Sequence, residues 1–433
     1  MTTDFTVSDR LLPDPELDRL VRSLNDAART GQVGDETPPT EPPETPSDPP
    51  PAPVDTPGRA SVTAPPSPSA RRWPLPPETA EGQAKLRELL TTARSTHASD
   101  LLLVAGSPPQ ARVNGRLEPL EEAPLSRETV GALAAALVPR SRRDETESTS
   151  RLDLAFTKPT LGRFRCNVHR ERGRWAAAIR LFPEAVPSLS SLQLPEQLER
   201  LAQREHGLLL VTGATGAGKS TTLAAVVRSI LGRRRVHLIT IEDPVEYEHR
   251  GDGSVVEQVE VGSDTTSFAD ALRSTLRQDP DVILIGEMRD AETMSVAITA
   301  AETGHLVLAT LHTGDAPQTV HRIVDTYPGV QQDAVRAQLA ASLTAIASQC
   351  LLPRRDGRGR VPAMEILVAT HAVRNLIRTG RVEQLRSQIG LEQHAGMLDL
   401  DQGLARLVQD GLVDREVARN RAREPEVFDS HLA

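Results

Sequence analysis

The amino-acid sequence predicts an α/β protein with a doubly wound parallel sheet, a smaller α+β domain before it and a helical segment after it. The sheet is predicted because, from about residue 207, apolar runs alternate with glycine-rich turns and helical patterns, as in βαβ units. The first eighty residues differ, because sixteen of the 34 prolines lie between Pro38 and Pro77, among Thr, Ser, Glu, Asp and Ala. Such a composition is typical of a disordered arm.

These differences divide the 433-residue chain into four expected parts. We expect a disordered, proline-rich, acidic arm over 1–80, an α+β domain over 81–190, the sheet domain over 191–368 and a helical segment over 369–433.

The arm contains one candidate helix. Asp14 and Pro15 form an N-cap and first-turn pair, and apolar residues then recur at helical spacing at Leu17, Leu20, Val21 and Leu24. A helix this short is marginal alone in water. Two interpretations stay open: a docking peptide that folds on a partner, or a nascent helix with no dedicated partner.

The charge distribution argues against a nucleic-acid partner. The formal net charge is −9, and residues 1–80 carry 13 acids against 7 arginines, so the rest of the chain is close to neutral. A nucleic-acid-binding surface would show a basic stripe or patch. We therefore expect no nucleic-acid partner.

Two further classes are excluded by what the sequence lacks. No run approaches the ~20 apolar residues of a bilayer span, and the N-terminal MTTDFTVSDR has no basic region followed by an apolar run. Cys166 and Cys350 are the only cysteines, which leaves neither a disulfide framework nor a cysteine-built zinc site. We expect a soluble cytoplasmic protein whose metal, if it has one, is held by oxygen or imidazole ligands.

The α+β domain is expected to begin with a helix and continue as strands. Residues 81–95 have a helical pattern, and Asn114-Gly115 is a hairpin signal inside the segment ARVNGRLEPL. Strands are expected over 101–105, 111–120, 152–156, 164–169 and 175–181, the last of them rich in arginine.

The sheet domain is expected to contain four apolar strands, over 208–212, 236–241, 282–285 and 306–310, with helices between them. Beyond residue 369, apolar positions recur at helical spacing at Val373, Leu376 and Ile377, and again at Leu400, Leu404 and Leu407. This pattern predicts the helical C-terminal segment.

A phosphate-binding loop is the strongest functional signal. The segment from Gly213 to Ser220 fits G-x-x-x-x-G-K-[ST] without a mismatch, between an apolar strand and a helix. Its backbone N–H groups and the helix N-terminus would cradle phosphate. Lys219 would contact the β- and γ-phosphates, and the Ser220 hydroxyl would be a magnesium ligand. The expected nucleotide-binding residues are Gly213, Ala214, Thr215, Gly216, Ala217, Gly218, Lys219, Ser220 and Thr221.

Two acidic clusters and a histidine follow at predicted strand ends. TIEDPVE places Glu242 after the second strand, and DPDVILIGEMRD places Glu287 after a buried one. Ligands bind at the carboxyl ends of open α/β sheets, and a carboxylate there holds magnesium in phosphate-loop enzymes. His305 and His312 bracket the next strand, and His312 has the position of a γ-phosphate sensor; a structural role for either histidine stays open.

These motifs carry a family resemblance. The glycine loop, ITIEDPVEYEH and RQDPDVILIGEMRDAETMSVAITAAETGHLVLATLHT resemble the Walker A, Asp box, atypical Walker B and His box of the type II/IV secretion ATPases. Within that superfamily the likeness is strongest to the PilT-like retraction ATPases of type IV pili, which drive twitching motility. The likeness spans about residues 81–420.

The resemblance implies a homohexamer of subunits, each with a PAS-like N-terminal domain and a RecA-like ATPase domain that bind ATP and Mg²⁺. It implies that Glu242 is the general base, that Glu287 positions magnesium with Ser220, and that His312 senses the γ-phosphate. Arginines of the N-terminal domain would complete the pocket. Arg165, Arg170 and Arg180 are the candidates, with Arg165 and Arg180 preferred.

The same resemblance implies work at the cytoplasmic face of the inner membrane, on a platform protein at the base of the pilus. It also implies an accessory retraction ATPase paralogue as a partner. Ala214 and Ala217 replace the family's usual Pro and Ser, and Val259 replaces a basic residue. Two alternatives stay open: a pilus-extension or type II secretion ATPase, and a non-hydrolysing nucleotide-binding accessory subunit. The former usually carries a four-cysteine zinc module.

Overall fold

The computed structural model describes residues 74–432 except 114 and 252. Most of the predicted arm, including its candidate helix, lies outside the described residues. The predicted α/β class is confirmed, and the division into four parts stays a prediction.

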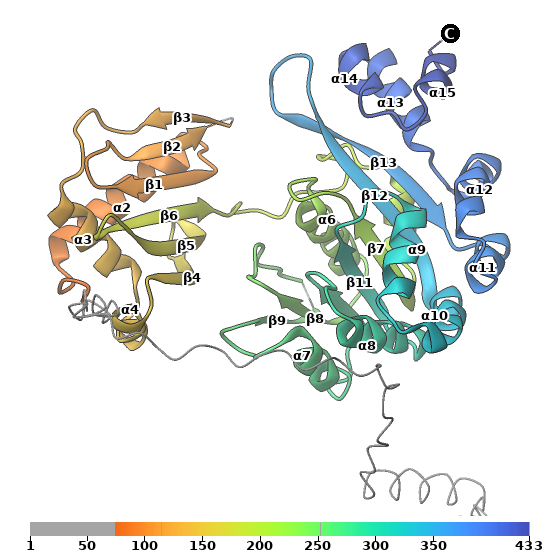
Figure 1. Ribbon diagram of the computed structural model, residues 1–433, viewed down its shortest axis with the longest axis horizontal. Coiled ribbons are helices and arrows are strands. Elements are labelled where there is room, and N and C mark those ends of the chain that lie inside the picture. Colours follow the sequence, from red (N-terminus) through yellow and green to blue (C-terminus); the bar gives the residue numbers. More distant parts are fainter. Residues whose placement is uncertain (1–73, 114, 252, 433) are drawn as a thin grey trace, which may run out of the picture. The chain divides into compact units, whose positions relative to one another are not determined.

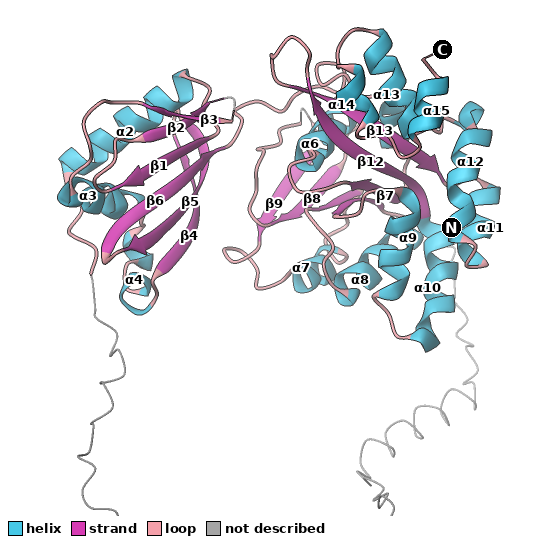
Figure 2. Cartoon of the chain, turned by 45° about the horizontal axis from the view of Figure 1, so that its top comes forward, coloured by secondary structure: helices cyan, strands magenta, loops and turns pink. Residues whose placement is uncertain are grey.

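Six strands of the described chain form an antiparallel sheet in the order β3-β2-β1-β6-β5-β4. Figure 2 shows α2 and α3 against one face of this sheet, where Leu89 and Leu133 join a buried cluster with Leu101 and Ile179. The elements are α2 (Ala80–Ser95), β1 (Asp100–Val104), β2 (Gln110–Val113), β3 (Arg116–Pro119), α3 (Arg127–Leu137), α4 (Glu145–Ser148), β4 (Arg151–Lys158), β5 (Gly162–Glu171) and β6 (Arg174–Leu181).

Seven strands form the second sheet in the order β13-β12-β7-β11-β10-β8-β9, counting described residues only. Neighbours from β12 to β9 are parallel, and β13 is antiparallel at the edge. Its strands are β7 (Gly207–Thr212), β8 (His237–Glu242), β9 (Val255–Glu260), β10 (Val282–Ile285), β11 (Leu306–Leu311), β12 (Leu343–Pro353) and β13 (Arg360–Val368).

Helices cover both faces of the parallel sheet (Figure 1). Alternate residues of β7 show why: Leu208 and Leu210 pack in one core cluster, and Leu209 and Val211 pack in another. Strands buried on both faces are typical of doubly wound sheets. The helices are α5 (Glu196–Ala202), α6 (Lys219–Leu231), α7 (Phe268–Thr275), α8 (Ala291–Glu302), α9 (Ala316–Asp325) and α10 (Gly329–Ser342).

The four strands predicted for this sheet are β7, β8, β10 and β11, and all four are confirmed. The sequence reading did not anticipate β9, β12 or β13. The last two form a long hairpin that pairs Ala345 with Val368 and Pro353 with Arg360. A short apolar run such as LTAIASQCLL is compatible with a buried helix as well as a strand.

The C-terminal part is helical, as predicted. Val373 and Ile377 are buried on α11, and Leu404 is buried on α13. The helices are α11 (His371–Arg378), α12 (Leu385–Leu391), α13 (Leu400–Gln409), α14 (Arg415–Arg419) and α15 (Pro425–Ser430). Within the described chain, none of the helices is long and apolar enough to cross a membrane.

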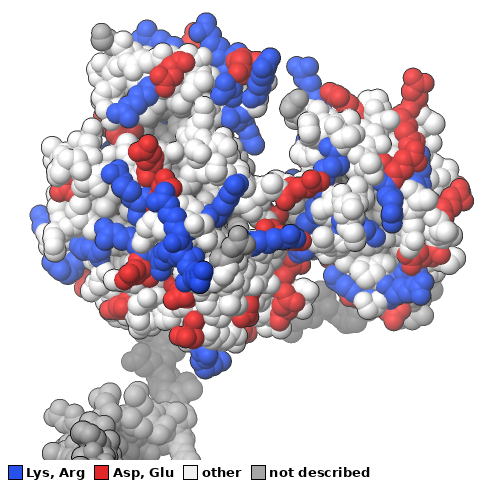
Figure 3. Space-filling view, turned by 180° about the vertical axis from the view of Figure 1, so that it is seen from behind, with Lys and Arg blue, Asp and Glu red and all other residues white. Residues whose placement is uncertain are grey.

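Acidic and basic side chains are interspersed over the face drawn in Figure 3. Many ion pairs join exposed partners, such as Arg142 and Glu145 at 2.8 Å, whose side chains are 39% and 46% exposed. Exposed pairs of this kind stabilise a protein by about 0–1 kcal/mol.

Candidate active site

The loop Gly213–Ser220 connects the buried strand β7 to α6, which begins at Lys219. Gly213, Gly216 and Gly218 have φ values of +146°, +79° and +89°, a region that side chains disfavour. A Cβ atom on Gly213 would lie 2.4 Å from the Gln349 carbonyl oxygen. Glycine is required here both by the backbone and by the close approach of β12.

Lys219 curls back onto the loop. Its ammonium donates hydrogen bonds to the carbonyl oxygens of Gly213 at 2.9 Å and Ala214 at 3.2 Å. Burial lowers the pKa of Lys219, while the charges of Glu287 and Glu246 act in the opposite sense. Two carboxylates therefore favour the charged form of Lys219.

The loop is braced from the β12–β13 hairpin. The buried amide of Gln349 donates to the Ala217 carbonyl oxygen at 2.7 Å and accepts from the Thr222 hydroxyl at 2.7 Å. Arg360 donates to the Gly216 carbonyl oxygen at 3.3 Å. Sequence reasoning gave neither residue a role, because both lie more than a hundred positions from the loop along the chain.

Parallel pairing brings the predicted catalytic residues to one edge of the sheet. Glu242 ends β8, Glu287 follows β10 and His312 follows β11. His312 contacts Lys219 through Nδ1 at 3.4 Å and Glu287 through Nε2 at 3.2 Å. Glu287, His312 and the loop lysine therefore form one contiguous cluster.

His305 does not share this cluster. It precedes β11 at the opposite end of that strand, where its Nδ1 contacts the Ala300 carbonyl oxygen at 3.0 Å. This contact fits the structural interpretation of His305.

Glu242 is held in a buried, hydrogen-bonded setting. Its side chain accepts from the Thr240 hydroxyl at 2.7 Å and from the Gln258 amide at 3.4 Å. Burial raises the pKa of Glu242 to about 7, although these hydrogen bonds oppose the shift. A carboxylate with a pKa near neutrality is suited to proton transfer.

The pKa of Glu287 is shifted in the opposite direction, below its ordinary value. Burial disfavours its ionised form, but hydrogen bonds and charge from Arg289 and His312 outweigh burial and lower the pKa. Its salt bridge with Arg289 is a direct contact. Glu287 is therefore a carboxylate that stays ionised and can attract a cation.

Glu246 is a further acid of the site that sequence reasoning gave no role. Burial raises its pKa, and a hydrogen bond with Ser220 opposes that shift, as do the charges of Arg180, Arg165 and Lys219. Next to it, the Tyr247 hydroxyl donates to Thr221 at 3.0 Å. The signal in the sequence was the second glutamate of TIEDPVE.

The two preferred arginines lie opposite each other on β5 and β6, in one register pair. Arg180 also pairs with Asp100 at 3.1 Å. Arg170, the third candidate, stacks over the Trp175 ring at 4.0 Å. Sequence reasoning missed Arg163 of β5, which pairs with Glu260 and donates to the Val245 carbonyl oxygen at 2.6 Å.

Residues 176–418 match the family model described as "Type II/IV secretion system protein". The chain belongs to this family. It is 43% identical to the "Type IV pilus retractation ATPase PilT" of Pseudomonas aeruginosa, over 79% of this chain and 99% of that protein. The same family resemblance was predicted from the motifs and is confirmed.

A solved family member is also similar in structure. The "Crystal Structure of the Pilus Retraction Motor PilT and Bound ADP" matches with a TM-score of 0.74 and 43% identity, over 79% of this chain and 98% of that one. The "Type II secretion system protein E" of Klebsiella pneumoniae is 48% identical, but over only 37% of this chain and 30% of that protein. Similarity to the retraction ATPase therefore extends over much more of the chain.

Proposed function

We propose that this chain is the ATP-hydrolysing subunit of a hexameric motor that retracts type IV pili and so drives twitching motility. One observation carries the proposal: the chain matches 99% of the length of the retraction ATPase PilT at 43% identity. Its phosphate loop, Glu287 and His312 also form a connected cluster. The motor would act from the cytoplasmic side of the inner membrane on a platform protein, with an accessory paralogue as a further partner.

Glu242 is the proposed general base. It would accept a proton from the attacking water, and a pKa of about 7 matches a base that works near neutral pH. The Thr240 hydroxyl orients its carboxylate at 2.7 Å.

Ser220 and Glu287 are the proposed magnesium ligands, since a hydroxyl and an ionised carboxylate are both oxygen donors. Among the described residues, no group of three or more His, Cys, Asp or Glu side chains could form a closed metal cage. Mg²⁺ at nucleotide sites usually takes only one or two protein ligands, with phosphates and water completing its shell. When bound, Mg²⁺ would neutralise phosphate charge; Glu287 would stay ionised beside it and Ser220 would offer its hydroxyl.

Lys219, His312, Arg165 and Arg180 would stabilise charge on the transferring phosphoryl group. Phosphoryl transfer depends mainly on positioning and electrostatics, and one arginine can change turnover by ~10³–10⁵. Arginines that approach only on closure would couple hydrolysis to movement between domains.

Phosphate release by the purified full-length chain tests the catalytic part. We expect Mg²⁺-dependent turnover that falls to background in Lys219→Ala, because this substitution removes the cation at the phosphates. Wild-type protein that binds ADP but releases no phosphate would support the accessory-subunit alternative instead.

A deletion strain tests the direction of force. Loss of surface motility with excess pili would support retraction, and bald cells would support the extension ATPase. The two cysteines of the chain also argue against the four-cysteine module of extension and secretion ATPases.

A further inference from the structure

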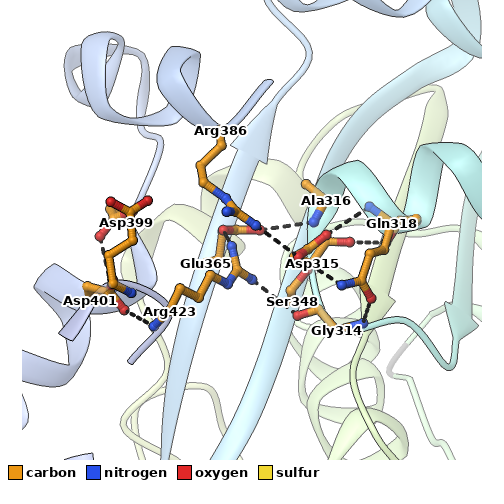
Figure 4. Close-up of polar contacts among 12 residues, drawn as sticks. Gly314, Asp315, Ala316, Gln318, Ser348, Glu365, Arg386, Asp399, Asp401 and Arg423 are labelled. Carbon is orange, nitrogen blue, oxygen red and sulfur yellow. Dashed lines mark hydrogen bonds and ion pairs between the residues drawn. The ribbon is translucent and has the colours of Figure 1, made fainter. Parts of the chain in front are cut away.

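An ion pair between a buried glutamate and a partly buried arginine joins β13 to the C-terminal segment, next to the loop that follows His312 (Figure 4). Glu365 on β13 is 0% exposed, and its carboxylate pairs with the guanidinium of Arg423, between α14 and α15. The other oxygen of Glu365 accepts from the Ala316 N–H at 3.0 Å. Ala316 is the first residue of α9, and N–H groups of a first helical turn lack partners within the helix.

The same guanidinium also reaches the loop itself. Arg423 donates through its second terminal nitrogen to the Gly314 carbonyl oxygen at 3.1 Å. Arg386 on α12 pairs with Asp315, the N-cap of α9, at 3.3 Å. Charged side chains thus hold Gly314, Asp315 and Ala316, which follow closely after His312 in the chain.

Arg423 is itself held by α13. The buried carboxylate of Asp401 accepts from the backbone N–H groups of Arg423 at 2.8 Å and Glu424 at 2.9 Å. The position of the guanidinium therefore follows the position of α13. A displacement of this helix would be transmitted to Gly314.

The chemistry of the pair is specific. A guanidinium presents several donors in a planar fork, so one side chain can bind a carboxylate and a carbonyl oxygen at once. An ammonium is a single point charge and would bind one of them well. Because Glu365 is fully buried, loss of its arginine partner would leave an uncompensated buried charge.

We propose that Glu365 and Arg423 are positioning residues for His312, and that they couple the C-terminal helices to the nucleotide site. They act by fixing Gly314 and Ala316, which follow His312 in the chain. His312 in turn contacts Lys219 at 3.4 Å and Glu287 at 3.2 Å. This inference rests on the proposed ATPase function and adds to it a control from the C-terminal segment.

Arg423→Lys in the full-length chain tests the coupling, with Arg419→Lys as the matched control. Arg419 pairs with Asp429 at 2.9 Å in the same segment, but its side chain is 48% exposed. We expect Arg423→Lys to lower kcat about tenfold with ADP affinity unchanged, because misplacing a catalytic group impairs the reaction more than binding. The control should stay within about twofold of wild type.

A double-mutant cycle with His312→Ala shows whether Arg423 acts through this histidine. We expect Arg423→Lys to have no further effect on kcat once His312 is absent, since residues acting through one another are not additive. Effects that multiply, or wild-type kcat in Arg423→Lys, would overturn the proposal.

Hydrogen exchange with ADP as the only ligand gives a readout that does not depend on turnover. We expect peptides covering residues 312–319 to exchange at least about fivefold faster in Arg423→Lys, and unchanged in Arg419→Lys. Unchanged exchange in Arg423→Lys overturns the coupling.

Wild-type protein without turnover would refute the proposed ATPase function, while hydrogen exchange would still decide the coupling. If Arg423→Lys does not fold, as judged by circular dichroism, Glu365→Gln replaces it with the same expected outcomes.

Discussion

The ends of β8 and β10 carry two glutamates, Glu242 and Glu287, in similar sequence settings. Their pKa values are nevertheless shifted in opposite directions. Glu242 ends β8 and Glu287 follows β10, and these two apolar strands are neighbours in the sheet. Glu242 is 9% exposed, and burial raises its pKa to about 7. At Glu287, burial also opposes ionisation, yet Arg289 and His312 lower the pKa. Neighbouring groups, rather than the strand pattern, therefore set the opposite pKa shifts on which the proposed base and the proposed cation ligand rest.

The largest expected effect comes from removing the charge of Glu242. We expect Glu242→Gln to lower kcat by about 10³-fold, because it deletes the proposed base without changing its shape. At pH 8 the free energy of unfolding of the same variant should be about 2 kcal/mol higher than that of wild type, because a buried carboxylate no longer has to ionise. The variant should therefore unfold at a higher urea concentration. Initial rates and urea titrations measure both effects.

Glu257→Gln is the control for this variant, because Glu257 lies on the adjacent β9 and its side chain is 50% exposed. Turnover of Glu242→Gln within tenfold of wild type would remove Glu242 from the chemistry.

A smaller loss is expected from Glu287→Gln. This change leaves Arg289 without its carboxylate and weakens the proposed cation site, so we expect kcat to fall about 10²-fold and the Mg²⁺ requirement to rise. Magnesium titrations of phosphate release measure it. Glu292→Gln, in an exposed pair with Arg273, is the control. An unchanged Mg²⁺ requirement would contradict the division of labour between the two glutamates.

The pH dependence has the smallest expected amplitude. Because the folded-state pKa of Glu242 lies near 7, above its ordinary value of 4.5, the base is protonated at low pH. We expect kcat/KM to rise about tenfold from pH 6 to pH 8 and this limb to be absent in Glu242→Gln. Burial also raises the pKa of Glu246, so Glu246→Gln is the variant that separates the two acids.

The contribution of Glu242 to stability has a pH dependence opposite to that of the activity. The folded state binds this proton more tightly than the unfolded state, so the contribution is fully present below pH 4.5 and is lost as pH rises through about 7. Activity and this part of stability therefore change in opposite directions with pH.

Much of the candidate site could be predicted because its signals are local. The phosphate loop is eight contiguous residues between a strand and a helix, and Glu242, Glu287 and His312 each follow an apolar strand. The rule that parallel strands share a carboxyl edge then brings them together. Their roles stay proposals until the variants are measured.

The supporting residues could not be predicted in the same way. Gln349 meets the phosphate loop from β12, and Arg423 meets Gly314 from the far end of the chain. Neither lies near the loop in the sequence, and β12 has an apolar pattern that a buried helix would share.

By itself, the sequence determined the α/β class, the strands that flank the nucleotide site and the residue types offered to phosphate, because these depend on neighbours within one strand or turn. The tertiary structure decided which glutamate is buried, which arginine stacks on Trp175 and which one holds Gly314. Burial, charge and hydrogen bonding are set by groups that are distant along the chain, so these properties exist only once the sheet and its helices have assembled.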